Sequence, residues 1–127
     1  MNKQKLVKRL KKISMAFDDL ISDLEEENAP ERSKPIFLPT PFGKAQEAAW
    51  KRGIKWRITE TEYKRLMELM CHYCGCDISP HKGIRLDRLN HDYGYHLDNV
   101  VSCCYACNTE RGTSFTSEQF RVRKERP

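Results

Sequence analysis

The chain has 127 residues, 32% of them charged and 39% hydrophobic. This composition suits one small core under a well-solvated surface and excludes a core large enough to enclose a bulky cofactor. The net charge of +5 arises after residue 30, because residues 1–30 carry six basic and six acidic side chains. The start, MNKQKLVKRLKKI, lacks the apolar core of a secretory signal, and no segment approaches the length of a membrane span. We therefore expect a cytoplasmic chain with no membrane partner.

Apolar residues recur at alternating spacings of four and three positions near the start of the chain. They are Leu6, Leu10, Ile13, Phe17, Leu20 and Leu24. This pattern predicts an amphipathic helix over residues 1–27 that buries one seam. Four prolines within residues 28–41 predict an extended linker, so that residues 42–127 form a separate domain.

The first half of that domain is predicted to be mainly helical. Residues 43–52 are expected to form a short helix and residues 54–58, IKWRI, an extended piece. Thr59 and Glu62 have the spacing of a capping box, which predicts a helix that continues to about Met70.

The second half is predicted to contain two strands and two helices. Residues 84–90, IRLDRLN, and residues 99–103, NVVSC, are the expected strands, with a turn at residues 92–94. A helix should begin near the last cysteine pair, and a second capping box, Thr116 with Gln119, should open a C-terminal helix.

Six cysteines include two CxxC pairs with 29 residues between them. In a reducing compartment, such pairs predict four thiolates around one structural zinc ion, because each tight turn directs two sulfurs at a tetrahedral centre. The predicted ligands are Cys71, Cys74, Cys104 and Cys107. Disulfide or redox chemistry is the alternative. We interpret Cys76 as a residue of the first knuckle and Cys103 as a small buried side chain on a strand.

The order CHYCG, LDRLNHDYGYHLDNVVSCCYACN and Arg111-Gly112 resembles the zinc-ribbon branch of the HNH endonucleases, the ββα-metal nucleases of phages and mobile elements. Residues 49–59 also resemble the lead-in that precedes this module. The resemblance covers residues 42–121. It implies an α+β fold in which a small ββα-metal (HNH) module, pinned by a four-cysteine zinc site, is preceded by helices. It also implies metal-dependent hydrolysis of DNA phosphodiester bonds.

The resemblance implies that Asp87 and Asn108 hold a catalytic Mg²⁺ or Mn²⁺ ion and that Asn99 braces the loop between the strands. The chemistry agrees, because one divalent ion on few oxygen ligands can neutralise charge on the phosphate and on the leaving oxygen. Taken singly, Asp87 is better explained by a surface salt bridge to Arg85 or Arg88, and Asn108 by a helix cap.

The sequence departs from the family pattern directly after the strand aspartate. The usual member of the family that this chain resembles carries a histidine there as general base, whereas this chain has Arg88, which cannot deprotonate water at neutral pH. We expect Arg88 to stabilise phosphate charge. His91, in the same loop, is the first candidate for the base. Further candidates are Tyr73, His81 and His96.

Contacts to DNA backbone phosphates are expected from four basic residues of the domain. They are Lys82, Arg85, Arg88 and Arg111. The alternative function is a non-catalytic zinc module that binds nucleic acid or protein, which the missing histidine favours and the retained Asp87 and Asn108 disfavour. A third possible function is that of a cytosolic redox protein.

Charge along the N-terminal helix opposes the helix macrodipole. Six basic residues lie within residues 3–12 and six acidic residues within residues 18–27. Two antiparallel copies would set each basic half against an acidic half, which predicts a homodimer through this helix. The alternatives are a seam that packs on its own domain and a basic half that clamps DNA.

Overall fold

The computed structural model describes residues 2–28, 34–78 and 83–125 and divides the chain into two compact units, Met1–Ile36 and Phe37–Pro127. In the first unit, α1 spans Lys3–Asn28, close to the predicted bounds. Its backbone starts with a side-chain cap, since Asn2 Oδ1 accepts from the Lys5 amide at 2.8 Å. No described helix has the length and apolar character that crossing a bilayer requires.

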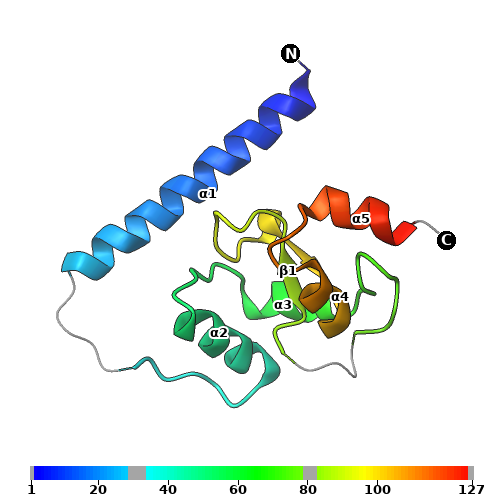
Figure 1. The fold of residues 1–127 in the computed structure, drawn as a ribbon. Coiled ribbons are helices and arrows are strands. Elements are labelled where there is room, and N and C mark those ends of the chain that lie inside the picture. The colour runs from blue at the N-terminus through cyan, green and yellow to red at the C-terminus, as the bar shows by residue number, and fades with distance from the viewer. Residues whose placement is uncertain (1, 29–33, 79–82, 126–127) are drawn as a thin grey trace. The chain divides into compact units, whose positions relative to one another are not determined.

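Two helices open the second unit (Figure 1), and a capping side chain fixes where each begins. Helix α2 spans Pro41–Lys51, and Thr40 caps it by accepting from the Gly43 amide at 3.1 Å. Helix α3 spans Glu60–Met67. The predicted capping box is present, with reciprocal bonds of 3.2 and 2.9 Å between Thr59 and Glu62.

Helix α3 ends three residues before the predicted end at Met70. The amides of Glu68 and Leu69 donate to the carbonyls three residues earlier, at 3.2 and 3.1 Å. These tighter bonds close the last turn and release the chain toward the first cysteine pair.

A two-stranded antiparallel sheet lies at the centre of the second unit. Strand β1 spans Leu86–Arg88, β2 spans Val100–Ser102, and Asp87 pairs with Val101. A short 3₁₀ turn, η1, over Leu97–Asn99 leads into β2. Helix α3 contacts β2.

The predicted extended piece at residues 54–58 docks beside the loop between the strands. Trp56 forms a parallel bridge with Tyr95, and the Tyr95 amide donates to the Lys55 carbonyl at 2.8 Å. A Cβ at Gly94 would lie 2.6 Å from that carbonyl oxygen, so this close approach requires glycine. The lead-in is therefore packed against the ββα unit.

Two helices complete the chain. Helix α4 spans Tyr105–Arg111 and begins at the second cysteine pair, and α5 spans Ser117–Glu125. The capping box at Thr116 and Gln119 is present, with bonds of 3.1 and 3.0 Å. Strand, loop, strand and helix follow in the predicted ββα order, which confirms the α+β fold.

The second unit has two buried clusters that meet at the sheet. One is built from apolar residues of the helices, the lead-in and the strands: Ala45, Ala49, Ile58, Tyr63, Leu86, Tyr95 and Val100. The other is unusually rich in cysteine: Cys71, Tyr73, Ile78, Cys103, Cys104, Cys107 and Phe120. Four of the seven residues in this second cluster are cysteines.

Candidate metal and nuclease site

Four thiols gather between the first knuckle and the start of α4. The sulfurs of Cys71, Cys74, Cys76 and Cys104 all lie within 4.8 Å of one another, and those of Cys74 and Cys104 are 3.8 Å apart. Cys107 borders the same centre: burial raises the pKa of its thiol, and the neighbouring thiols of Cys104 and Cys74 raise it further. Thiols at this spacing fit a tetrahedral zinc ion, and the cluster can bind zinc.

The backbone of each knuckle explains how the sulfurs converge. In the first, the Cys71 amide donates to the Cys76 carbonyl at 2.8 Å, and Gly75 adopts a φ of 76°, which favours glycine. In the second, Cys104 is the N-cap of α4, and its sulfur accepts from the Cys107 amide at 3.4 Å. Both turns thus point thiols inward, and the first also carries Cys76 into the cluster.

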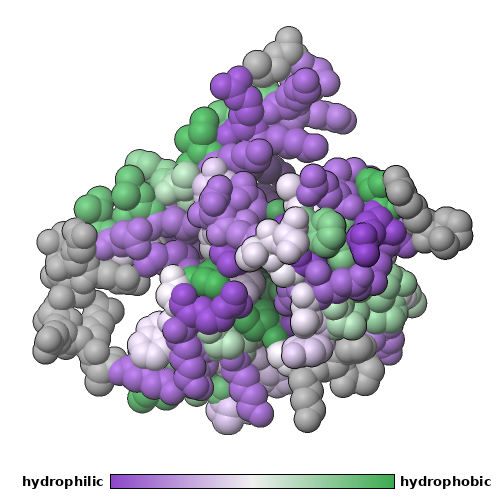
Figure 2. Space-filling view, viewed as in Figure 1, coloured by the Kyte–Doolittle hydropathy of each residue, from purple (hydrophilic) through white to green (hydrophobic). Residues whose placement is uncertain are grey.

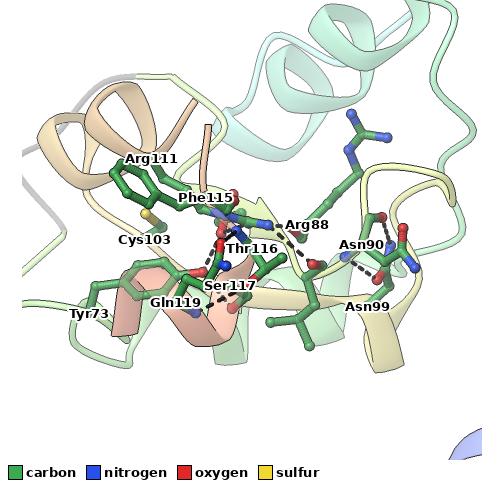
Figure 3. A network of polar contacts seen from close by, with 12 residues as sticks. Tyr73, Arg88, Asn90, Asn99, Cys103, Arg111, Phe115, Thr116, Ser117 and Gln119 are labelled. Carbon is green, nitrogen blue, oxygen red and sulfur yellow. Dashed lines mark hydrogen bonds and ion pairs between the residues drawn. The ribbon is translucent and has the colours of Figure 1, made fainter. Parts of the chain in front are cut away.

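The Asp87 carboxylate lies inside the unit and is only 2% exposed. Its Oδ2 accepts from the Tyr73 hydroxyl at 2.5 Å and forms an ion pair with the Arg111 guanidinium. The Tyr73 hydroxyl also contacts Ser117 Oγ at 2.8 Å. Tyr73 from the first knuckle and Arg111 from α4 therefore converge on one carboxylate of β1, and Ser117 from α5 contacts the Tyr73 hydroxyl (Figure 3).

Arg111 is also buried, with 2% exposure, and its guanidinium is fully directed inward. Besides Asp87, it donates to the carbonyls of Arg88, Leu89 and Phe115 at 2.5, 3.1 and 3.1 Å. The sequence analysis expected Arg111 to contact DNA phosphates. The structure instead uses it to join α4 to the end of β1, because a buried cation requires a counter-charge and acceptors.

Arg88 follows Asp87 on β1 and points to the other side of the strand. Its Nη1 donates to the carbonyls of His91 and Tyr93 at 3.1 and 2.9 Å, and its guanidinium lies 5.6 Å from the centre of the Tyr95 ring. These contacts hold the partly exposed guanidinium over the loop between the strands.

His91 is exposed in that loop, and its pKa is lowered from the ordinary 6.5. Partial burial contributes most, followed by the positive charges of Arg111 and Arg88. Both effects penalise the imidazolium, so His91 is neutral at pH 7 and can accept a proton. Tyr73 differs, because burial and its bond to Asp87 raise the pKa of its hydroxyl well above 10.0.

Asn99 is buried and ties the loop together through its side-chain amide. Its Oδ1 accepts from the Asn90 amide at 3.0 Å, and its Nδ2 donates to the carbonyls of Asn90 and Gly94 at 3.0 and 2.9 Å. These bonds agree with the bracing role that the resemblance implies.

The remaining predicted residues have varied positions. Asn108 is exposed on α4, three residues before Arg111 and hence on the same side of the helix. Arg85 lies just before β1 with a positive φ of 61°, and His96 is buried. Lys82 and His81 lie outside the described residues.

Sequence reasoning missed the contributions of Cys76 and Ser117. Cys76 falls outside both CxxC pairs, although its position two residues after Cys74 was a usable signal. Ser117 reaches Tyr73 across 44 positions of sequence, and no spacing indicates that contact.

Comparisons with known proteins agree with this geometry. No protein-family model matches the chain. Over 69 residues, 54% of the chain, it is 36% identical to the uncharacterised protein R423 of Acanthamoeba polyphaga mimivirus, and it spans 13% of that relative's length.

A solved structure of the rare-cutting HNH restriction endonuclease PacI is similar over 67% of this chain and 72% of that one. The TM-score is 0.56 and the sequence identity is 22%. Together with the thiol cluster and the order of strands and helices, this similarity shows that residues of the second unit adopt the ββα fold of an HNH endonuclease.

Proposed function

We propose that the protein is a metal-dependent DNA endonuclease of the HNH type. The observation that carries the proposal is the position of Asp87. In a fold shared with an HNH endonuclease, β1 holds this carboxylate against α4, the helix that also carries Asn108. An acidic group at this junction supports the use of a divalent cation.

Asp87 and Asn108 are the residues that would hold Mg²⁺ or Mn²⁺. The described contacts of Asp87 with Tyr73 and Arg111 both end on Oδ2, so Oδ1 is the oxygen we assign to the cation. Carboxylate and amide oxygens are the ligands these ions prefer. When bound, such an ion neutralises charge on the scissile phosphate and on the leaving oxygen.

Arg88 and His91 would supply the other chemical functions. Arg88 is held by two loop carbonyls and is half-buried, which supports a fixed positive charge beside the phosphate. His91 is neutral at pH 7 and exposed, so it can take the proton of the attacking water. Tyr73 fits this role less well, because its raised pKa keeps the hydroxyl protonated as a donor to Asp87.

DNA contacts would come from basic residues around this site and would be mostly sequence-independent. Arg85 and Arg88 flank Asp87, and Lys82 lies close by in sequence. Phosphate contacts of this kind make binding sensitive to salt. Arg111 is assigned to holding Asp87 in place, because its guanidinium is buried.

A non-catalytic zinc module is the second candidate function. It is favoured by the ion pair of the buried Asp87 with Arg111, since a purely structural carboxylate would make the same contact. In that case Asp87 would stabilise the fold, and the basic surface would bind nucleic acid without cutting it.

The two candidate functions are distinguished by measuring DNA binding and DNA cutting on the same zinc-loaded samples. Asp87→Asn should lose nicking of supercoiled plasmid in Mg²⁺ or Mn²⁺ while retaining DNA affinity, because it removes negative charge near phosphate. Arg88→Ala should slow cutting with a modest loss of affinity. Wild-type protein that binds DNA but does not nick it in either metal would establish the binding module instead.

A further inference from the structure

Helix α1 presents an apolar stripe along one side. Six seam residues, Leu6, Leu10, Ile13, Phe17, Leu20 and Leu24, are between 50% and 62% exposed. Figure 2 shows apolar side chains gathered along one flank of α1 and hydrophilic ones along the other. This stripe is too long and too regular to be explained as scattered surface residues.

The unit that contains α1 cannot bury this stripe by itself. Residues Met1–Ile36 form a compact unit whose described secondary structure is the single helix α1. A helix has no second face on which to fold its own apolar side, and isolated helices are marginal in water. The stripe therefore requires a partner surface of similar length, about 27 Å at 1.5 Å per residue.

The charges on α1 indicate what that partner is. The first turn has no acidic residue and the last turn has no basic residue. This arrangement costs stability in a lone helix, because charge at both ends opposes the macrodipole. A second α1 in the opposite direction would place acidic residues beside the basic half and basic residues beside the acidic half.

The seam is self-complementary in that antiparallel arrangement. With the two-fold axis at the level of residue 15, Leu6 faces Leu24, Leu10 faces Leu20, and Ile13 faces Phe17. Every seam residue thus meets a seam residue of the other copy, as the a and d layers of antiparallel helices do.

The residues beside the seam match in the same register. On one flank Val7 meets Ile21, both of which are exposed apolar residues. On the other flank Arg9 meets Asp23, and the two-fold axis repeats this opposite-charge pair. A parallel pair would instead align basic half with basic half, which costs affinity.

From these observations we propose that α1 binds the α1 of a second copy of this chain as an antiparallel, two-fold symmetric pair. The inference does not depend on nuclease activity. It makes the protein a dimer through the unit Met1–Ile36, with one Phe37–Pro127 unit attached to each helix.

Sedimentation equilibrium of the zinc-loaded full chain tests the seam. The wild type should be a dimer at tens of micromolar, and a truncated chain that starts at Glu31 should be a monomer. Ile13→Asp should also give a monomer, because each copy then places a charge against Phe17 of the other copy. A wild-type monomer, or a truncated chain that still dimerises, would overturn the proposal.

Charge reversal tests the direction of pairing. Arg9→Asp and Asp23→Arg should each weaken the dimer by roughly tenfold in Kd, because each creates two like-charge contacts. An equimolar mixture of the two variants should form a heterodimer of wild-type strength, since both contacts become attractive again. Lys8→Asp is the matched control: it carries the same charge change on the side away from the seam and should leave Kd unchanged.

The dimer affinity of the mixed variants distinguishes an antiparallel from a parallel pair of helices. Arg9 and Asp23 are far apart in a parallel pair, so neither single reversal would act through the other residue. Equal weakening by Arg9→Asp and Lys8→Asp, or a mixture that stays as weak as the single variants, would contradict the antiparallel pair. Circular dichroism of each variant verifies that the helix is retained.

Discussion

The Asp87 carboxylate is buried, and we propose that it also binds a cation. Its ion pair with Arg111 lies almost entirely out of solvent, where removal of one partner leaves the other charge uncompensated. Loss of activity in an alanine variant would therefore be confounded with loss of folding. Asparagine keeps an oxygen acceptor for Tyr73 and Arg111 and is the cleaner replacement.

We predict different stabilities for the two Asp87 variants. Asp87→Ala should lower the free energy of unfolding by about 3–5 kcal/mol, because Arg111 stays buried with neither a counter-charge nor an oxygen acceptor at position 87. Asp87→Asn should cost about 1–3 kcal/mol, because the acceptor is retained. Urea unfolding of zinc-loaded protein measures both values. Equal stability of the alanine variant and the wild type would mean that the Arg111 contact contributes nothing.

The pH dependence of cleavage should report the state of His91. As general base it must be neutral, and its lowered pKa keeps it neutral at all pH values above its ordinary 6.5. The rate should rise with pH only below 6.5 and stay level above it. His91→Ala should lower the rate by about 10²-fold or more and abolish this rise. A wild-type rate that keeps rising above pH 8 would transfer the role to Tyr73.

For individual residues, the sequence predicted the element that carries each one better than its burial and its contacts. The motif located Asp87 on the first strand and Asn99 at the loop. Burial of Arg111 was not predictable, because arginine is normally exposed and its partner Asp87 lies 24 positions away. The same holds for Ser117, whose contact depends on how α5 packs.

At the scale of elements, the loop between the strands depends on one side chain. Asn99→Ala removes three hydrogen bonds, two with Asn90 and one with Gly94, so it should destabilise the protein by about 2–4 kcal/mol. Asn90→Ala is the matched control, since its Oδ1 accepts one exposed bond from the Asp92 amide. Thermal unfolding compares them; similar losses would show that the bracing is not specific to Asn99.

The four clustered thiols and that of Cys107 together offer five thiols for the four ligand positions of a zinc ion. Cys71, Cys74 and Cys104 are shared by the predicted set and by the observed cluster. We propose Cys107 as the fourth ligand in the zinc-bound protein, because each knuckle then supplies two thiolates. The thiols of Cys104 and Cys74 also raise the pKa of the Cys107 thiol, as expected of neighbouring groups.

The purified protein should contain about one zinc ion per chain, and a strong chelator should unfold its second unit. Cys107→Ser should weaken zinc binding far more than Cys76→Ser does. Competition with a chromophoric chelator gives the affinities, and cobalt substitution reports the number of thiolate ligands. If Cys76→Ser causes the larger loss, Cys76 is the fourth ligand. Folded protein without zinc would contradict the site itself.

Local signals explain why the starts of α3 and α5 were predictable, whereas both strands are shorter than the predicted residues 84–90 and 99–103. Both capping boxes, at Thr59 and Thr116, begin helices where expected, since they satisfy amides with side chains close in sequence. The early end of α3 was not predictable, because residues 68–70 have no breaker, and the chain leaves the helix to build the first knuckle. The end of α3 is therefore set by tertiary packing and not by a local sequence signal.

At the scale of the whole molecule, we assign a different function to each of the two units. The second unit carries the ββα fold and the cysteine cluster, and the first carries a self-complementary helix. If both proposals hold, a dimer presents two sites to one DNA molecule, so that both strands can be cut without dissociation. The excess positive charge of residues 31–127 would favour the approach to DNA.

The central claim is that Asp87 holds a divalent ion that cleaves DNA. It is tested most directly by the initial rate of plasmid nicking in Mn²⁺ for wild-type and Asp87→Asn proteins with equal zinc content. Both are used at saturating DNA, where binding differences no longer matter. We predict that the wild type nicks the plasmid and that Asp87→Asn is slower by at least about 10³-fold. Equal rates in the two proteins would contradict the account.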